Sequence, residues 1–143
     1  MQQKISFGRS LESEQKPEKL AGYGPHLTID GYQCDKEKLS DMMRVFKVLD
    51  ELPGIIGMTK IITPYVIPYI GLKPEDWGIS GFVMIAESHI SVHTYPEKGF
   101  VAIDVFSCKQ FNVSDAVDYL SKAFGIKEAE QHVVQRAMKF QKT

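Results

Sequence analysis

The chain has 143 residues, a length typical of one domain that buries its own hydrophobic core. Its 18 acidic and 17 basic residues nearly cancel and are scattered, which argues against a nucleic-acid-binding protein. Two cysteines are too few for a secreted disulfide scaffold, the N-terminal residues contain no apolar signal core, and no apolar run is long enough to cross a bilayer. We therefore expect a cytoplasmic protein, outside the membrane, that binds a small molecule or another protein.

The first part of the chain predicts an extension, a strand and a helix. Residues 1–23 are polar without a sustained hydrophobic period, so we expect an N-terminal extension followed by one domain at 24–143. Residues 26–34 are typical of a strand. Asp35 is a suitable N-cap for a helix over 36–52, which the following Pro-Gly pair would end. The apolar residues at helical spacing are Leu39, Met42, Met43, Phe46 and Leu49.

The second part of the chain predicts five strands and one helix. The apolar, β-branched residues at 58–67 include Pro64, which favours a bent or edge strand. Further strands are expected at 81–86, 88–94, 100–108 and 131–138. The turn at 95–99 joins two of them as a hairpin. Asn112 is a predicted N-cap and Gly125 a predicted stop for a helix whose apolar stripe is Val113, Ala116, Val117, Leu120 and Phe124.

Together these elements predict an α+β fold. Strands outnumber helices, and the short connections favour antiparallel neighbours. We expect a two-layer α/β sandwich, in which helices cover one face of a mostly antiparallel sheet.

Residues 86–94, Ala-Glu-Ser-His-Ile-Ser-Val-His-Thr, gather reactive side chains in an otherwise apolar run. Ser88, His93 and the later Cys108 can each take part in covalent or proton-transfer chemistry. Residues five apart in an unbroken strand point to opposite faces, so Ser88 and His93 meet only if the strand is broken near Ser88. The simplest alternative gives all three an ordinary structural role.

Two further kinds of site use overlapping residues. A metal site could combine His89, His93 and Cys108, but no paired Cys-x-x-Cys or His-Glu-x-x-His spacing supports it, so we expect no metal. A hydrolase could combine Ser88, His93 and Asp104, but the Gly-x-Ser-x-Gly elbow of such enzymes is missing from the sequence.

Residues 87–97, Glu-Ser-His-Ile-Ser-Val-His-Thr-Tyr-Pro-Glu, and 99–108, Gly-Phe-Val-Ala-Ile-Asp-Val-Phe-Ser-Cys, resemble the processing site of bacterial and archaeal S-adenosylmethionine decarboxylases. The family has similar residues where this chain has His26-Leu27, Asp30, Cys34-Asp35 and Gly78-Ile79-Ser80-Gly81. The resemblance runs from about residue 24 to residue 124. Tyr95 is a departure, because tryptophan is usual at that position.

The resemblance implies that the chain is a proenzyme that cuts itself between Glu87 and Ser88. The products would be a beta chain, 1–87, and an alpha chain, 88–143. Attack of the Ser88 hydroxyl on the Glu87 carbonyl would form an ester, and elimination would then convert Ser88 into a covalent pyruvoyl group. This cofactor forms a Schiff base with the substrate amine and accepts electrons when carbon dioxide leaves.

The resemblance also assigns roles to other side chains. Ser80 is the expected oxyanion donor during processing, His93 the proton-transfer group, and Cys108 the proton donor during decarboxylation. Tyr95 is expected to stack on the adenine and Glu97 to bind the ribose hydroxyls. Candidates for the second wall of the adenine site are Tyr65, Tyr69 and Trp77.

The implied function is decarboxylation of S-adenosylmethionine for spermidine biosynthesis, in a homodimer of cleaved protomers. One alternative keeps the pyruvoyl chemistry and decarboxylates arginine or ornithine, which would need carboxylates around a distal cation. Another alternative is a non-catalytic binding or regulatory relative with the same fold.

Overall fold

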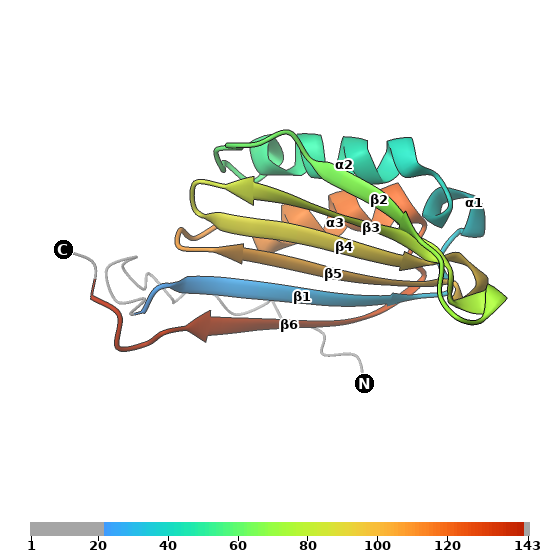
Figure 1. Ribbon diagram of the computed structural model, residues 1–143. Coiled ribbons are helices and arrows are strands. Elements are labelled where there is room, and N and C mark those ends of the chain that lie inside the picture. The colour runs from blue at the N-terminus through green and yellow to red at the C-terminus, as the bar shows by residue number, and fades with distance from the viewer. Residues whose placement is uncertain (1–21, 142–143) are drawn as a thin grey trace.

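Six strands form one antiparallel sheet in the computed structural model, which describes residues 22–141. The strands are β1 (Gly24–Tyr32), β2 (Tyr65–Tyr69), β3 (Gly78–Ile85), β4 (Ser88–Tyr95), β5 (Phe100–Ser107) and β6 (Glu128–Arg136). The helices are α1 (Lys36–Leu39), α2 (Met42–Ile55) and α3 (Val113–Phe124), with short 3₁₀ turns η3 (Pro74–Asp76) and η4 (Pro96–Lys98). The order across the sheet is β2-β3-β4-β5-β1-β6, and each neighbouring pair is antiparallel. The predicted α+β fold is confirmed, with helices on one side of the sheet (Figure 1).

Residues 1–21 and 142–143 lie outside the described part of the chain. Most of the predicted extension at 1–23 is therefore not described, and the division of the chain at residue 24 stays a prediction.

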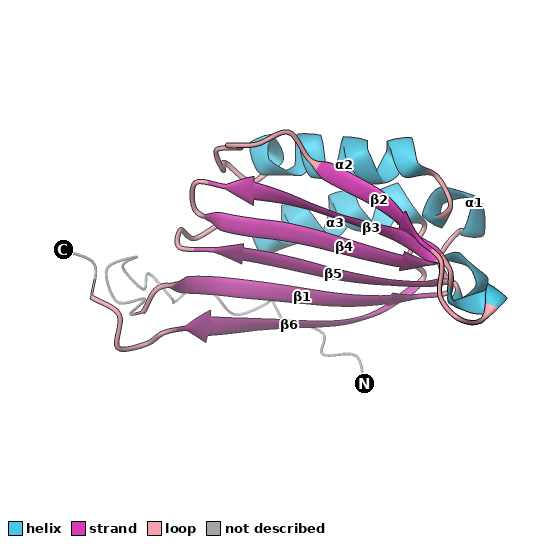
Figure 2. Ribbon diagram, in the orientation of Figure 1, coloured by secondary structure: helices cyan, strands magenta, loops and turns pink. Residues whose placement is uncertain are grey.

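Alternate residues of the strands point toward the helices and form the core. The strand side chains buried in it are Leu27, Ile29, Ile79, Val83, Ile85, Ile90, Val92, Val101, Ile103 and Val105. Removing a side chain of this size from water contributes about 1.5–3 kcal/mol. The remaining strand residues line the second face, which no described helix covers (Figure 2), and which we call the open face. On the four central strands it includes His26, Thr28, Asp30, Ser80, Phe82, Met84, His89, Ser91, His93, Ala102, Asp104 and Phe106.

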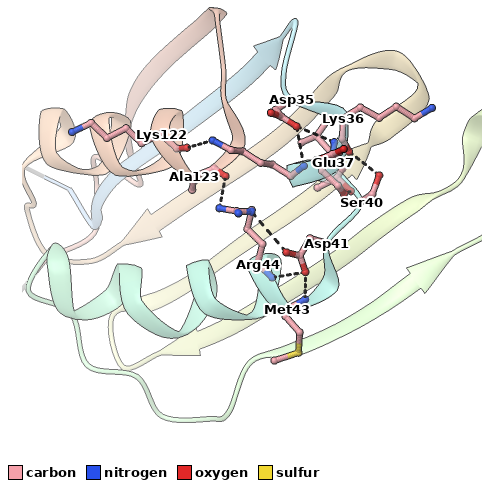
Figure 3. Close-up of polar contacts among 12 residues, drawn as sticks. Asp35, Lys36, Glu37, Ser40, Asp41, Met43, Arg44, Lys122 and Ala123 are labelled. Atoms are coloured by element: carbon pink, nitrogen blue, oxygen red, sulfur yellow. Dashed lines mark hydrogen bonds and ion pairs between the residues drawn. The ribbon is translucent and has the colours of Figure 1, made fainter.

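The predicted helix over 36–52 is wrong, because it is two helices with separate caps. Asp35 caps α1 as expected, accepting hydrogen bonds from Glu37 N and Lys38 N. Asp41 is a second N-cap and accepts hydrogen bonds from the backbone N–H groups of Met43 and Arg44 at 3.0 and 3.2 Å (Figure 3). The new cap changes the phase of α2, whose buried side chains are Val45, Val48, Leu49, Leu52 and Pro53. Of the predicted stripe, Leu39 and Leu49 are buried, whereas Met42 and Met43 are exposed and Phe46 is only partly buried.

The end of α2 also differs from the prediction, since the helix continues through Pro53 to Ile55. A proline so close to the C-terminus removes only one backbone hydrogen bond. The carbonyl of Pro53 accepts a hydrogen bond from Met58 N at 2.7 Å, which closes the final turn. With 14 residues, α2 is the longest described helix, and none in residues 22–141 is both long and apolar enough to span a membrane.

The predicted edge strand at 58–67 lies further along the chain, as β2 (Tyr65–Tyr69). Its edge position is confirmed, and Pro68 is tolerated there because an edge strand can leave one side unpaired. The preceding residues run beside the end of β3 instead, with Lys60 bridged to Ile85. This segment therefore supports the turn between β3 and β4.

The prediction for α3 is confirmed at both ends. The Asn112 side chain accepts a hydrogen bond from Asp115 N at 3.0 Å, and Gly125 ends the helix at φ 63°. Ala116, Leu120 and Phe124 are fully buried, as the stripe predicted.

Candidate active site

Ser88 and Cys108 lie together at one end of the central strands. A two-residue turn, Ala86-Glu87, joins β3 to β4, and Ser88 is the first residue of β4. Ser88 pairs with Ser107, the last residue of β5, so Cys108 follows directly beside it. The Cys108 N–H donates a hydrogen bond to the Glu87 carbonyl at 2.8 Å. The predicted cleavage bond and the predicted proton donor are therefore neighbours.

The Glu87 side chain is held by the segment that precedes β2. The Thr59 N–H donates to Glu87 Oε1 at 3.0 Å, and the Thr59 carbonyl accepts from Ala86 N at 2.8 Å. These two hydrogen bonds fix the position of the turn that precedes the predicted cleavage bond. Sequence reasoning missed Thr59 because it assigned that region to a strand of its own.

Tyr23 is a third component that sequence reasoning missed. Its hydroxyl lies 2.8 Å from Ser88 Oγ and donates to the Glu87 carbonyl at 3.5 Å. The prediction included Tyr23 in the N-terminal extension, because residues 1–23 are polar without a sustained hydrophobic period. The following Gly24 offers a signal in retrospect, because a Cβ there would lie 1.9 Å from the Ser107 carbonyl oxygen.

Ser80 and His93 lie together nearer the opposite end of β4. They are register partners on β3 and β4, and Ser80 Oγ lies 2.9 Å from His93 Nδ1. Both side chains are on the open face, and His93 is exposed to solvent. The resemblance assigns Ser80 and His93 to the processing reaction, and the structure places their hydroxyl and imidazole in hydrogen-bond contact.

Tyr95 and Glu97 lie at that same end, beyond His93. The Tyr95 ring centroid lies 5.6 Å from that of Phe100. The Glu97 carboxylate accepts hydrogen bonds from Lys36 Nζ at 2.8 Å and Trp77 Nε1 at 3.3 Å. The hydrogen bond from Lys36, followed by that from Trp77, lowers the pKa of Glu97, so the carboxylate stays ionised and can accept further hydroxyl donors.

Of the three candidates for the second adenine wall, Trp77 is the one beside Glu97. Tyr65 and Tyr69 lie on the edge strand β2, with 58% and 55% of their surfaces exposed. Tyr65 packs on Phe82 at a centroid distance of 5.8 Å.

The site residues thus form two groups at opposite ends of the sheet. We call Tyr23, Glu87, Ser88 and Cys108 the serine group, and Ser80, His93, Tyr95 and Glu97 the histidine group. His93 is five residue steps along the extended strand from Ser88, which is about 17 Å at 3.3 Å per residue. Figure 1 shows β4 running from one end of the sheet to the other. β4 is continuous from Ser88 to Tyr95, and its unusual backbone is at its first residue, where Ser88 has a positive φ of 158°. The Ser88 hydroxyl contacts Tyr23, whose ring packs on Phe106 of the open face.

The other reactive side chains have structural partners. Asp104 lies 2.9 Å from His26 Nε2, and so the carboxylate of the hydrolase alternative is paired with a histidine other than His93. The His89 ring packs on Phe106 at 5.6 Å, and burial lowers the pKa of His89. Within residues 22–141, no three His, Cys, Asp or Glu side chains are arranged to hold a metal ion.

Known proteins match both the sequence and the fold. A profile of the family described as S-adenosylmethionine decarboxylase matches residues 25–137. The S-adenosylmethionine decarboxylase proenzyme of Symbiobacterium thermophilum is 38% identical over 105 residues, 72% of this chain and 74% of that protein. The proenzyme of Thermococcus kodakarensis is 34% identical over 116 residues, 80% of this chain and 77% of that protein.

A solved structure has the same fold. The crystal structure of the adenosylmethionine decarboxylase from Aquifex aeolicus superposes with a TM-score of 0.70 at 26% sequence identity. The match covers 86% of this chain and 98% of the Aquifex chain. The family profile spans all six strands and both groups of site residues except Tyr23 and the first residue of β1, so this chain belongs to the S-adenosylmethionine decarboxylase family.

Proposed function

We propose that this chain is a self-processing proenzyme that cuts itself between Glu87 and Ser88 and then decarboxylates S-adenosylmethionine for spermidine biosynthesis. The contact that carries the proposal is the hydrogen bond from Cys108 N to the Glu87 carbonyl at 2.8 Å. It keeps the reactive peptide, the serine hydroxyl and the thiol together at the end of two paired strands. It also polarises the carbonyl that the hydroxyl must attack.

The residues around Ser88 fit a pyruvoyl group made from that serine. Ser88 is only partly buried, follows a turn, and has its hydroxyl in contact with Tyr23. Such a group supplies a ketone that captures the substrate amine and accepts electrons as carbon dioxide leaves. Cys108 is the proposed donor of the Sγ proton that returns to the product carbon. His93 is the proposed base that removes the α-proton of Ser88 during processing, with Ser80 as oxyanion donor.

These roles require a homodimer, because His93 lies about 17 Å along β4 from the Ser88 of its own chain. A second copy can pack on the open face with the two-fold axis between the sheets and perpendicular to the strands. That rotation reverses the strand direction, so the histidine group of one protomer meets the serine group of the other. Exposed apolar side chains on this face, including Tyr65, Ile67, Phe82 and Met84, favour such burial.

The histidine group supports S-adenosylmethionine as the substrate. Tyr95 offers an aromatic face for adenine, Glu97 an ionised acceptor for ribose hydroxyls, and Trp77 a second aromatic beside it. Arginine and ornithine have no ring that could stack on Tyr95 or Trp77. The substrate is a small charged metabolite, which agrees with the cytoplasmic location that the sequence predicts.

The test is the mass of the purified chain under denaturing conditions. The wild-type protein should give two fragments divided after Glu87, the downstream one carrying a pyruvoyl terminus, and should release carbon dioxide from S-adenosylmethionine. The Ser88→Ala protein should remain one chain of 143 residues without activity. A Ser88→Ala protein that still decarboxylates would exclude the pyruvoyl mechanism. Wild-type activity on arginine but not on S-adenosylmethionine would show that the proposed substrate is wrong.

A further inference from the structure

We infer that Tyr23 is a catalytic residue of the self-cleavage reaction, acting within its own chain on the first step, the attack of Ser88 on the Glu87 carbonyl. The inference rests on the proposed function. Its carrying observation is that one phenol contacts both reacting groups, at 2.8 Å from Ser88 Oγ and 3.5 Å from the Glu87 carbonyl oxygen. None of the roles assigned above by resemblance includes this tyrosine.

The position of Tyr23 is determined by contacts on both its backbone and its ring. The Tyr23 N–H donates to the carbonyls of Arg136 and Ala137 at 2.8 and 3.2 Å. The ring packs between Phe106 and Phe140, at centroid distances of 5.3 and 5.2 Å. A phenol held from three sides directs its hydroxyl to one place, and such preorganisation is what makes a donor effective in catalysis.

The two hydrogen bonds form a path for one proton. Ser88 Oγ can donate to the Tyr23 oxygen while the Tyr23 hydroxyl donates to the Glu87 carbonyl. As the bond from Oγ to the carbonyl carbon forms, the Ser88 proton moves to Tyr23 and the Tyr23 proton moves to the carbonyl oxygen. The carbon–nitrogen bond then breaks, and the Ser88 nitrogen takes up the proton from that oxygen. An ester remains and the tyrosine is regenerated.

This role is compatible with the other donors at the same oxygen. The Cys108 N–H already donates to the Glu87 carbonyl at 2.8 Å, and a tetrahedral oxygen has lone pairs for more than one further donor. The 3.5 Å contact from Tyr23 is long in the uncut chain, and catalytic hydrogen bonds of this kind shorten as the reaction proceeds. Tyr23 would therefore assist acyl transfer, while His93 of the second copy acts on the later elimination.

The experiment measures the rate of self-cleavage of Tyr23→Phe by intact mass, in freshly made full-length protein. Phenylalanine keeps both ring contacts and removes only the hydroxyl. We expect cleavage about 100-fold slower than in the wild type, the usual effect of losing one such donor. The matched control is Tyr119→Phe, which removes a phenol hydroxyl that donates to Glu51 in the helix layer. It should cleave at the wild-type rate.

Hydroxylamine separates the two chemical steps, because it cuts an ester after Glu87 and leaves an intact serine at the new terminus. If Tyr23 acts on ester formation, little ester is present and hydroxylamine will not restore cleavage of Tyr23→Phe. Rapid cutting by hydroxylamine would instead mean that the ester forms without the phenol, which overturns the inference.

Two further outcomes separate this inference from the proposed function. If the wild-type chain cuts itself and Tyr23→Phe cuts itself equally fast, the role of Tyr23 is overturned and the proposed function stands. A wild-type chain that remains uncut overturns the proposed function, and the role of Tyr23 with it.

Discussion

Individual residues bring the chemistry of the serine group together through backbone contacts. Gly24 lets β1 approach β5 closely, since a Cβ there would lie 1.9 Å from the Ser107 carbonyl oxygen and 2.7 Å from Cys108 Cα. That approach keeps Tyr23 next to Ser88. Cys108 lies beside Ser88 because Ser88 pairs with Ser107 and the Cys108 N–H donates to the Glu87 carbonyl. At this end of the sheet, the absence of a side chain at Gly24 and the backbone hydrogen bond of Cys108 therefore determine which side chains lie next to Ser88.

Cys108→Ala should separate processing from turnover. The backbone N–H that contacts Glu87 is retained, so we expect the chain to cut itself. The proposed proton donor is lost, so turnover should fall about 100-fold or more, and some product should be protonated at the wrong atom. Intact mass measures the first effect, and product analysis measures the second. A variant with normal rate and product would exclude Cys108 as the donor.

Gly24→Ala should impair self-cleavage without touching a reactive group. The added methyl overlaps the backbone of Ser107 and Cys108, so β5 and β1 must move apart. We expect slower cleavage and a lower melting temperature. Gly54→Ala is the control, because a Cβ at that position has no atom within 4 Å. Wild-type cleavage in Gly24→Ala would show that the close approach is not needed.

At the scale of elements, caps decide where helices begin. The sequence shows apolar residues at helical spacing from Leu39 to Leu49. Asp41 nevertheless divides this segment, because its side chain accepts two backbone hydrogen bonds and so begins a new helix, α2. Met43 is consequently 72% exposed, whereas Val45 is fully buried. The contacts of Arg44 and Lys38 with carbonyls at the end of α3 then join the helices (Figure 3).

Asp41→Ala should weaken the helix layer and leave the chemistry intact. Removing an N-cap costs about 1 kcal/mol in the free energy of unfolding. We expect that loss in chemical denaturation, together with wild-type self-cleavage, since α2 lies on the face opposite to the histidine group. Asp118→Ala, an exposed position within α3, is the matched control and should change stability little. Equal stability of the two variants would argue against the cap.

At the scale of the whole molecule, the sheet separates the two groups of side chains that the proposed function combines. The serine and histidine groups lie at the two ends of β4, and in the dimer proposed above a two-fold symmetric partner on the open face would bring them together twice. The same proposed contact would bury the exposed apolar side chains of β2 and β3.

Mixing two inactive variants tests this arrangement. Ser88→Ala and His93→Ala should each stay uncut when produced alone. When they are produced together, a heterodimer contains one complete site, formed by Ser88 of the His93→Ala chain and His93 of the Ser88→Ala chain. We expect the His93→Ala chain alone to be cut, which intact mass distinguishes. No cutting in verified heterodimers would mean that each site is made within one chain.

The sequence by itself determined the fold class, the α3 helix with its caps, the edge position of β2 and the residues that match the family. These depend on local spacing, capping and turn chemistry, which neighbouring residues specify. Only the tertiary structure decided that α1 and α2 are separate, that Tyr23 and Thr59 reach the turn at Glu87, and that Ser88 and His93 are far apart. Such facts depend on pairing between distant strands and on the continuous course of β4, and no short stretch of sequence contains them.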